Sequence, residues 1–186
     1  MEELKKLIKG CASGDVRAQE KLYRMLAPKM FGVCLRYSKD RTEAEDNLQD
    51  GFVKVFENVH NFRHEGSFEG WVRRIMVNVS LGKFKKQNVL YPVEDIAVYE
   101  HEQISEDVFA KMGADDLMEL VQQLPPRYRM VFNLYVMEGF NHQQISEAMN
   151  ITEGTSKSNL ARAREILKRK VLELYNDIGT NTNYPA

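Results

Sequence analysis

The chain has 186 residues, of which 43% are hydrophobic and 28% are charged, and its formal net charge is -1. This length fits one medium domain or two small ones, and the composition is that of an ordinary globular protein. No apolar run is long enough to span a bilayer and the N-terminus lacks a secretory signal, so we expect a cytoplasmic protein with no stable membrane insertion.

The net charge near zero conceals a segregation of charge along the chain. Residues 1–86 contain 17 basic and 12 acidic residues, residues 87–116 contain 1 and 8, and residues 117–170 contain 8 and 5. Two basic blocks therefore flank an acidic segment, and either block could bind nucleic acid. The two cysteines, Cys11 and Cys34, and the four histidines show no metal-ligand spacing, so we expect reduced structural thiols, no metal and no cofactor.

The first block is predicted to be all-α, because its apolar residues recur at intervals of three and four without sustained alternation. The clearest helix starts after Asp40 and carries apolar residues from Ala44 to Val59 along one face. A polar loop over residues 61–67 separates it from another helix that ends at about Lys86. The core face of that second helix is expected to consist of Phe68, Val72, Ile75 and Val79.

Residues 87–114 break the helical pattern. They combine Pro92, an acidic excess and little periodicity, which predicts a flexible acidic linker. The second block then contains a helix that Pro125 and Pro126 terminate. Three more helices are predicted after it, at about Arg127–Met137, His142–Ala148 and Thr152–Tyr175, followed by a frayed tail.

The two predicted helices on either side of Asn150 have the pattern of a helix-turn-helix. This motif needs an apolar and then a small residue on the first helix, a residue that tolerates left-handed backbone at the turn, and an apolar residue directly after it. These places are filled by Ile145, Ala148, Asn150 and Ile151. Asparagine adopts positive φ readily, and Thr152 can cap the helix that follows.

The second helix of this pair presents short polar and basic side chains beside its apolar stripe. Lys157 and the arginines could neutralise phosphates, whereas Thr155, Ser158 and Asn159 are short enough to approach base edges in a major groove. An ordinary helical hairpin with a solvated charged face is the alternative interpretation of this segment.

Four short segments of the second block carry a family resemblance: LPPRYR at 124–129, GF at 139–140, GTSKS at 154–158 and ARAR at 161–164. They resemble the C-terminal domain of extracytoplasmic-function (ECF) sigma factors, which implies recognition of the minus-35 promoter element. The DNA contacts implied are Thr152, Glu153, Thr155, Lys157, Ser158, Asn159, Arg162, Arg164 and Lys168. Asn150 replaces the family's usual turn glycine and Asn159 replaces a frequent arginine, which leaves the promoter sequence open.

The first block contains a second match, AEDNLQDGFVKVF at 44–56, which resembles the family's helix that grips the polymerase clamp. The resemblance implies polymerase contacts at Asp46, Gln49, Asp50 and Val53. These residues form a stripe opposite the apolar one, and a stripe of carboxylates, an amide and an exposed aliphatic group suits protein docking. A solvated acidic helix surface is the alternative.

A third match, GSFEGWVRRIMVN at 66–78 with KFKK at 83–86, resembles the family's segment for minus-10 recognition and strand opening. The DNA contacts implied are Asn61, Arg63, Ser67, Arg73, Arg74, Asn78, Lys83, Lys85 and Lys86. Of these, Arg74, Asn78 and Lys85 fall on one helical stripe, and the loop before them could receive an unstacked base. Trp71 is expected in the core rather than as a stacking platform, and Gly82 stands where the family often has Asp or Asn.

In their order and spacing the three matches identify the chain as a member of the ECF sigma factors. The resemblance implies an all-α fold with an N-terminal sigma domain (1–86), a linker (87–114), a C-terminal helix-turn-helix domain (115–176) and a disordered tail (177–186). The implied partners are core RNA polymerase, promoter DNA and an anti-sigma factor. The implied function is that of a non-enzymatic subunit that directs polymerase to promoters and promotes DNA opening.

Two other function classes compete with this interpretation. An enzyme is disfavoured because the sequence shows no Gly-rich phosphate loop and no catalytic constellation. An autonomous helix-turn-helix regulator remains the alternative, and polymerase dependence separates the two. A regulator binds duplex DNA alone, commonly as a dimer, whereas a sigma factor requires the core enzyme.

Overall fold

The structure is a computed structural model that describes residues 2–90 and 114–180; the side chains of residues 87–90, 114–115 and 175–180 are outside this description. Within these ranges the chain is helical and contains no strand, as the all-α prediction requires. The chain divides into two compact units, residues 1–92 and 93–186. None of the described helices is long and apolar enough to cross a membrane.

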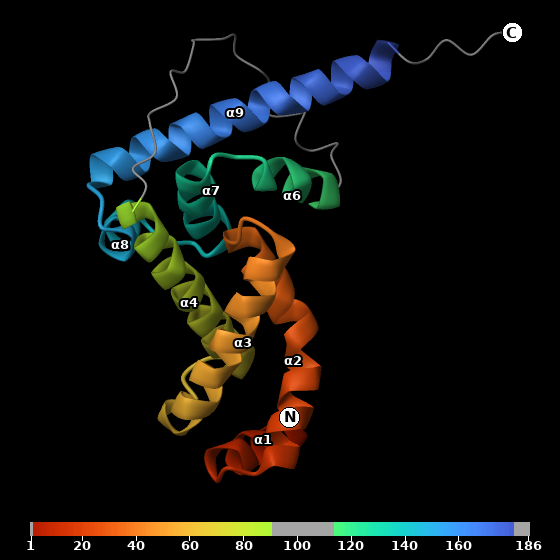
Figure 1. The fold of residues 1–186 in the computed structure, drawn as a ribbon, viewed down its shortest axis with the longest axis vertical. Helices are drawn as coiled ribbons and strands as arrows, with labels where there is room; N and C mark the ends of the chain where they lie inside the picture. Colours follow the sequence, from red (N-terminus) through yellow and green to blue (C-terminus); the bar gives the residue numbers. More distant parts are fainter. Residues whose placement is uncertain (1, 91–113, 181–186) are drawn as a thin grey trace, which may run out of the picture. The chain divides into compact units, whose positions relative to one another are not determined.

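The N-terminal unit is a group of helices in which α2, α3 and α4 pack side by side (Figure 1). Its elements are α1 (Glu2–Ala12), α2 (Val16–Tyr37), α3 (Arg41–Asn58), a 3-10 turn (Val59–Asn61) and α4 (Phe68–Leu90). Side-chain caps fix two of the helix starts. Asp15 accepts the backbone N–H of Arg17 at 2.9 Å, and Asp40 accepts that of Glu43 at 2.8 Å.

The core of this unit confirms the apolar stripe predicted for α3, because Ala44, Phe52 and Val55 are buried against α2 and α4. The stripe predicted for α4 is partly wrong: Ile75 and Val79 are only half-buried. The fully or nearly fully buried residues of α4 are Phe68, Val72, Met76, Val77, Ser80 and Leu81. This buried face is wide because α4 packs against two helices rather than one.

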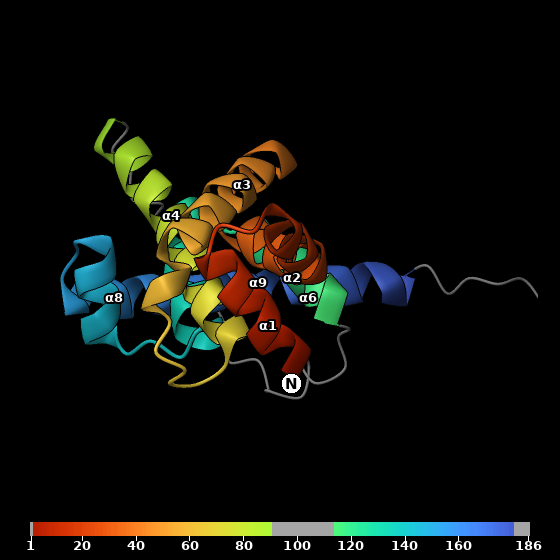
Figure 2. The same ribbon diagram turned by 90° about the horizontal axis from the view of Figure 1, so that it is seen from below.

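The C-terminal unit consists of short helices packed against one long helix. Its elements are α6 (Ala114–Gln122), α7 (Pro126–Phe132), a π-helical turn (Asn133–Met137), α8 (His142–Met149) and α9 (Glu153–Thr180). Both views place α8 against the N-terminal end of α9 (Figures 1 and 2). The apolar face of α9 contributes Leu160, Ala163, Leu167 and Val171 to the core.

Two predicted boundaries differ from the structure. Helix α4 continues to Leu90 and α9 to Thr180, so residues 87–90 of the predicted linker and 177–180 of the predicted tail are helical. No proline follows Lys86 before Pro92, and none interrupts α9, so nothing local ends either helix at the predicted residue. The rest of the predicted linker, up to residue 113, and residues 181–186 of the predicted tail lie outside the described residues.

Candidate nucleic-acid and protein interfaces

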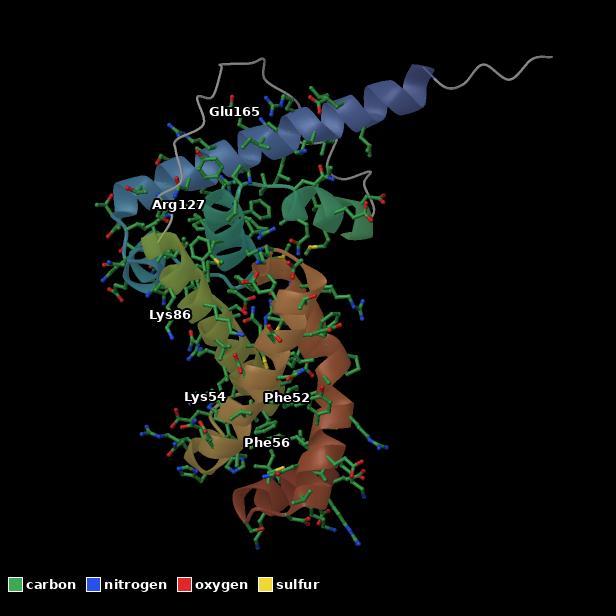
Figure 3. All side chains as sticks on the ribbon, in the orientation of Figure 1. Phe52, Lys54, Phe56, Lys86, Arg127 and Glu165 are labelled. Carbon is green, nitrogen blue, oxygen red and sulfur yellow. The ribbon has the colours of Figure 1, made fainter. Side chains whose placement is uncertain are left out.

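The predicted docking stripe lies on the exposed side of α3. Asp46, Gln49 and Asp50 are exposed, and Val53 keeps 54% of its surface accessible although it is aliphatic. Phe52 lies on the other side of the helix and is labelled in Figure 3. Its ring is tilted against the ring of Tyr23 of α2, with centroids 4.6 Å apart. The helix therefore separates a core face from a polar face that can meet another protein.

An ion pair joins this stripe to α4. The carboxylate of Asp50 lies 2.7 Å from the ammonium of Lys83, with 58% and 30% of the two side chains exposed. Lys83 follows Arg74 by nine residues, so at 3.6 residues per turn the two project from opposite sides of α4. The predicted polymerase contact Asp50 and the predicted DNA contact Lys83 are thus engaged with each other.

A buried chain of hydrogen bonds joins α3 to the C-terminal end of α2 and was not predicted. Asn47 donates from Nδ2 to the hydroxyl of Ser38 at 2.9 Å, and that hydroxyl donates to the carbonyl of Cys34 at 2.8 Å. The Oδ1 of Asn47 has no hydrogen-bond partner among the described residues. Burial raises the pKa of the Cys34 thiol to about 12, and the charge of Lys83 offsets only part of this effect. The thiol is therefore neutral and does not compensate the ammonium beside it.

The exposed side of α4 carries the predicted strand-binding residues Arg74 and Asn78, with Lys86 further along. Arg73 and Lys85 are half-buried, so they flank this exposed line rather than form it. Gly82 lies between Asn78 and Lys86 on α4, and a Cβ added there would meet no heavy atom within 4 Å. The helix surface at this position is therefore not covered by other side chains. A backbone could approach the helix closely here.

The loop before α4 is held by an aromatic cluster. Phe62 packs edge-on against Phe68 with centroids 5.0 Å apart, and Trp71 lies 5.7 Å from Phe62 and 5.5 Å from Phe68. Trp71 is therefore a packing residue, as expected, although it is half-buried rather than fully enclosed. The predicted DNA contacts of this loop, Asn61, Arg63 and Ser67, are all exposed.

The turn between α8 and α9 has the geometry of a helix-turn-helix. Asn150 adopts the left-handed conformation with φ 56° and ψ 50°, as predicted for the turn. Asn141 begins α8 with a reciprocal capping box in which Gln144 takes part. Thr152 begins α9 by accepting the backbone N–H of Thr155 at 3.0 Å. Short-range sequence signals thus account for both helix starts and for the turn.

The predicted minus-35 contacts divide into three groups by exposure. The exposed group is Thr152, Glu153, Thr155, Lys157, Ser158 and Arg164. Arg162 and Lys168 are half-buried, and the guanidinium of Arg162 donates to the hydroxyl of Tyr128 at 3.1 Å. Asn159 is only 7% exposed, so the side chain predicted to reach base edges is buried in this structure. It lies three residues after the buried Ser156, on the side of α9 that packs against the rest of its unit.

A set of side chains behind α9 ties its N-terminal end to the other helices. His142 shares a hydrogen bond of 3.0 Å between Nδ1 and the hydroxyl of Ser156, and its ring stacks on Tyr135 with centroids 4.9 Å apart. The guanidinium of Arg164 lies 5.8 Å from the centroid of the same Tyr135 ring. Sequence reasoning missed this set, because the residues come from the π-helical turn, α8 and α9.

Two family models match this chain, one on each unit. The model described as Sigma-70 region 2 matches residues 22–89, and the model described as Sigma-70, region 4 matches residues 114–167. The chain belongs to the sigma-70 family. Both regions of this sigma-70 protein occur in the order that the motifs predicted, and the predicted family is confirmed.

The relatives of this sigma-70 protein include several ECF sigma factors. It is 30% identical to the ECF RNA polymerase sigma factor SigE of Mycolicibacterium smegmatis over 84% of this chain and 64% of the relative. It is 27% identical to the RNA polymerase sigma-H factor of Pseudomonas aeruginosa, covering 93% and 96% of the two chains. It is 26% identical to the ECF RNA polymerase sigma factor SigW of Bacillus subtilis, over 92% of this chain and 98% of the relative.

Solved structures are similar to this chain at lower identity. Among them is the sigma factor RpoE in complex with the anti-sigma factor NepR from Bartonella quintana, with 20% identity and a TM-score of 0.49 over 85% of this chain and 98% of that chain.

Proposed function

We propose that this protein is an ECF sigma factor: a non-enzymatic subunit that binds core RNA polymerase, directs it to specific promoters and promotes DNA opening. The observation that carries the proposal is the pair of family matches, region 2 on the N-terminal unit and region 4 on the C-terminal unit. No observation favours an autonomous regulator over this function. The protein acts in the cytoplasm, where core polymerase and promoter DNA are found.

The N-terminal unit docks on polymerase and opens the DNA. The exposed stripe of Asp46, Gln49, Asp50 and Val53 supports docking, because two carboxylates beside an aliphatic group suit a basic partner surface with an apolar spot. The exposed Arg74 and Asn78 support contact with a single strand. The contacts proposed beside these two are Asn61, Arg63, Ser67, Arg73, Lys83, Lys85 and Lys86.

The C-terminal unit reads the minus-35 element through the N-terminal end of α9. The hydroxyls of Thr155 and Ser158 are exposed near the start of the helix and are short enough to reach base edges. Charged side chains around them support phosphate contacts. The residues proposed for phosphate contacts are Lys157, Arg162, Arg164 and Lys168. Thr152 and Glu153, at the helix start, are the remaining proposed minus-35 contacts, and the carboxylate of Glu153 suits a base amino group rather than a phosphate.

An anti-sigma factor is a further proposed partner. This proposal comes from the family resemblance. Capture of partners from bacterial lysate, followed by their identification, tests it together with polymerase binding.

The function is tested by reconstitution. The purified chain is mixed with core polymerase, and co-elution, promoter-specific transcripts and permanganate-reactive thymines are measured. We expect the chain to co-elute with the core as one copy, and we expect open complexes only when both are present. Binding of the chain alone, as a dimer, to two half-sites of duplex DNA would instead identify an autonomous regulator.

A further inference from the structure

One contact joins the two proposed interfaces of the N-terminal unit, namely the ion pair of 2.7 Å between Asp50 and Lys83. We propose that this pair withholds Lys83 from DNA in the free protein and that polymerase releases it by engaging Asp50. The inference rests on the proposed function, since it assigns Asp50 to polymerase docking and Lys83 to the DNA strand. It makes the free chain a weaker DNA binder than the same chain on polymerase.

The exposure of the two side chains supports the proposal that a polymerase cation replaces Lys83 at Asp50. Asp50 is 58% exposed and remains accessible to a cation arriving from solvent, whereas Lys83 is 30% exposed and is held against the protein. The buried Cys34 thiol, on which the charge of Lys83 acts, is neutral, and so are Ser38 and Asn47, which are hydrogen-bonded in a chain to the Cys34 carbonyl. Asp50 is thus the carboxylate that compensates the ammonium, and a basic polymerase side chain competes with Lys83 for it.

A released Lys83 would join a basic surface that already exists. Lys86 lies three residues later on α4, so the two side chains are neighbours on the helix surface. Lys86 is exposed and Lys85 lies beside it half-buried. Release of the Lys83 ammonium therefore adds one phosphate contact next to Lys86 at this end of α4.

This release of Lys83 couples polymerase binding to single-strand binding, and the coupling is reciprocal. If polymerase binding strengthens strand binding by a factor, strand binding must strengthen polymerase binding by the same factor. Partly exposed ion pairs are weak, so we expect a factor of about two to five. One additional phosphate contact also makes the salt dependence of single-strand binding steeper by about 0.7 in log–log slope.

The first experiment uses the isolated full-length chain and a fluorescent single-stranded oligo(dT), because phosphate contacts do not need a particular sequence. Asp50→Asn should raise the affinity about two- to fivefold and steepen the salt slope by about 0.7. The matched control is Glu45→Gln, which removes one charge from the same helix and frees Arg41 from an ion pair of 2.9 Å. Equal affinities and slopes for the two variants would overturn the proposal.

The second experiment measures Lys83→Gln both in the holoenzyme and in the isolated chain. Lys83→Gln should lower the salt slope of the holoenzyme by about 0.7 but leave that of the isolated chain nearly unchanged. It should also cancel the gain caused by Asp50→Asn in the isolated chain. If Lys83→Gln lowers the salt slope of the isolated chain as much as that of the holoenzyme, Lys83 contacts DNA in both states. That result would refute the proposal that Asp50 withholds it. Failure of the proposed function is recognised separately, by holoenzyme whose DNA opening is unchanged after Arg74→Ala and Asn78→Ala.

Discussion

A glycine allows α3 and α4 to approach closely, and its replacement has a predictable cost. A Cβ built at Gly51 would overlap Sδ of Met76 and lie 2.9 Å from its Cε. The Met76 side chain is flexible but fully buried, so it can move only by displacing other core groups. Overpacking of this kind costs about 1–3 kcal/mol, and alanine recovers about 1 kcal/mol through helix propensity. Gly51→Ala should therefore lower the free energy of unfolding by up to about 2 kcal/mol.

Gly32 on α2 provides the matched control, because no heavy atom lies within 4 Å of a Cβ built there. Gly32→Ala should raise the free energy of unfolding by about 0.5–1 kcal/mol through helix propensity. Urea unfolding is followed by the fluorescence of Trp71, the only tryptophan of the chain, which reports on the N-terminal unit. The reasoning is refuted if the Gly51 and Gly32 variants are equally stable, or if Met76→Val fails to reduce the cost of Gly51→Ala.

Three further predictions concern the Cys34 thiol, the DNA-binding face of α9, and the separation of polymerase docking from DNA opening in the N-terminal unit. Because the pKa of Cys34 is raised from 9.0 to about 12, the thiol ionises first in the unfolded chain, so unfolding free energy should fall by about 2 kcal/mol between pH 8 and pH 10.5. This decline should be smaller in the fluorescence-monitored unfolding of Cys34→Ala, in which only the thiol of Cys11, whose pKa burial also raises, still contributes. In α9, Arg164→Ala should weaken promoter binding by holoenzyme and flatten its salt dependence, whereas Ser158→Ala should change base preference by about 1–3 kcal/mol in a competition assay. Asp50→Lys should abolish co-elution with core polymerase, whereas Asn78→Ala should still co-elute yet give few permanganate-reactive thymines. Equal loss of polymerase binding in the last two variants would contradict the separation of roles.

The features that the sequence predicted well are those encoded by neighbouring residues. The start of α3 follows from Asp40, whose carboxylate caps the helix, and its core face follows from the spacing of apolar residues. The turn of the helix-turn-helix follows from Asn150, one of the few residue types that adopt positive φ without glycine's freedom. Both signals lie within a few residues of the feature that they specify.

Polar residues inside the C-terminal unit were beyond this kind of reasoning. Ser156 and Asn159 are polar, so the pattern placed Asn159 outside, yet both are buried. Burial of Ser156 is compatible with its hydroxyl because His142, fourteen residues away, lies within 3.0 Å of it. A partner from another helix decides such a position, and no local spacing contains that information.

The same limitation applies to the candidate site in the N-terminal unit, where two residues were assigned to two different partners. Asp50 and Lys83 were expected to face polymerase and DNA separately, but α3 and α4 pack so that the two side chains meet. Helical periodicity indicates the face of one helix on which a residue lies. It does not indicate which residue of a second helix lies opposite.

The close packing of α3 against α4 therefore bears on both proposed activities of this unit. Gly51, adjacent to Asp50 in sequence, permits contact with Met76, and the ion pair to Lys83 spans the same pair of helices. Any change that separates the helices should also lengthen this ion pair, because both contacts depend on one interhelical distance. Gly51→Ala should then resemble Asp50→Asn in raising single-strand affinity of the isolated chain, although it removes no charge. Unchanged affinity in a Gly51 variant with measurably lower stability would show that the packing and the ion pair are independent.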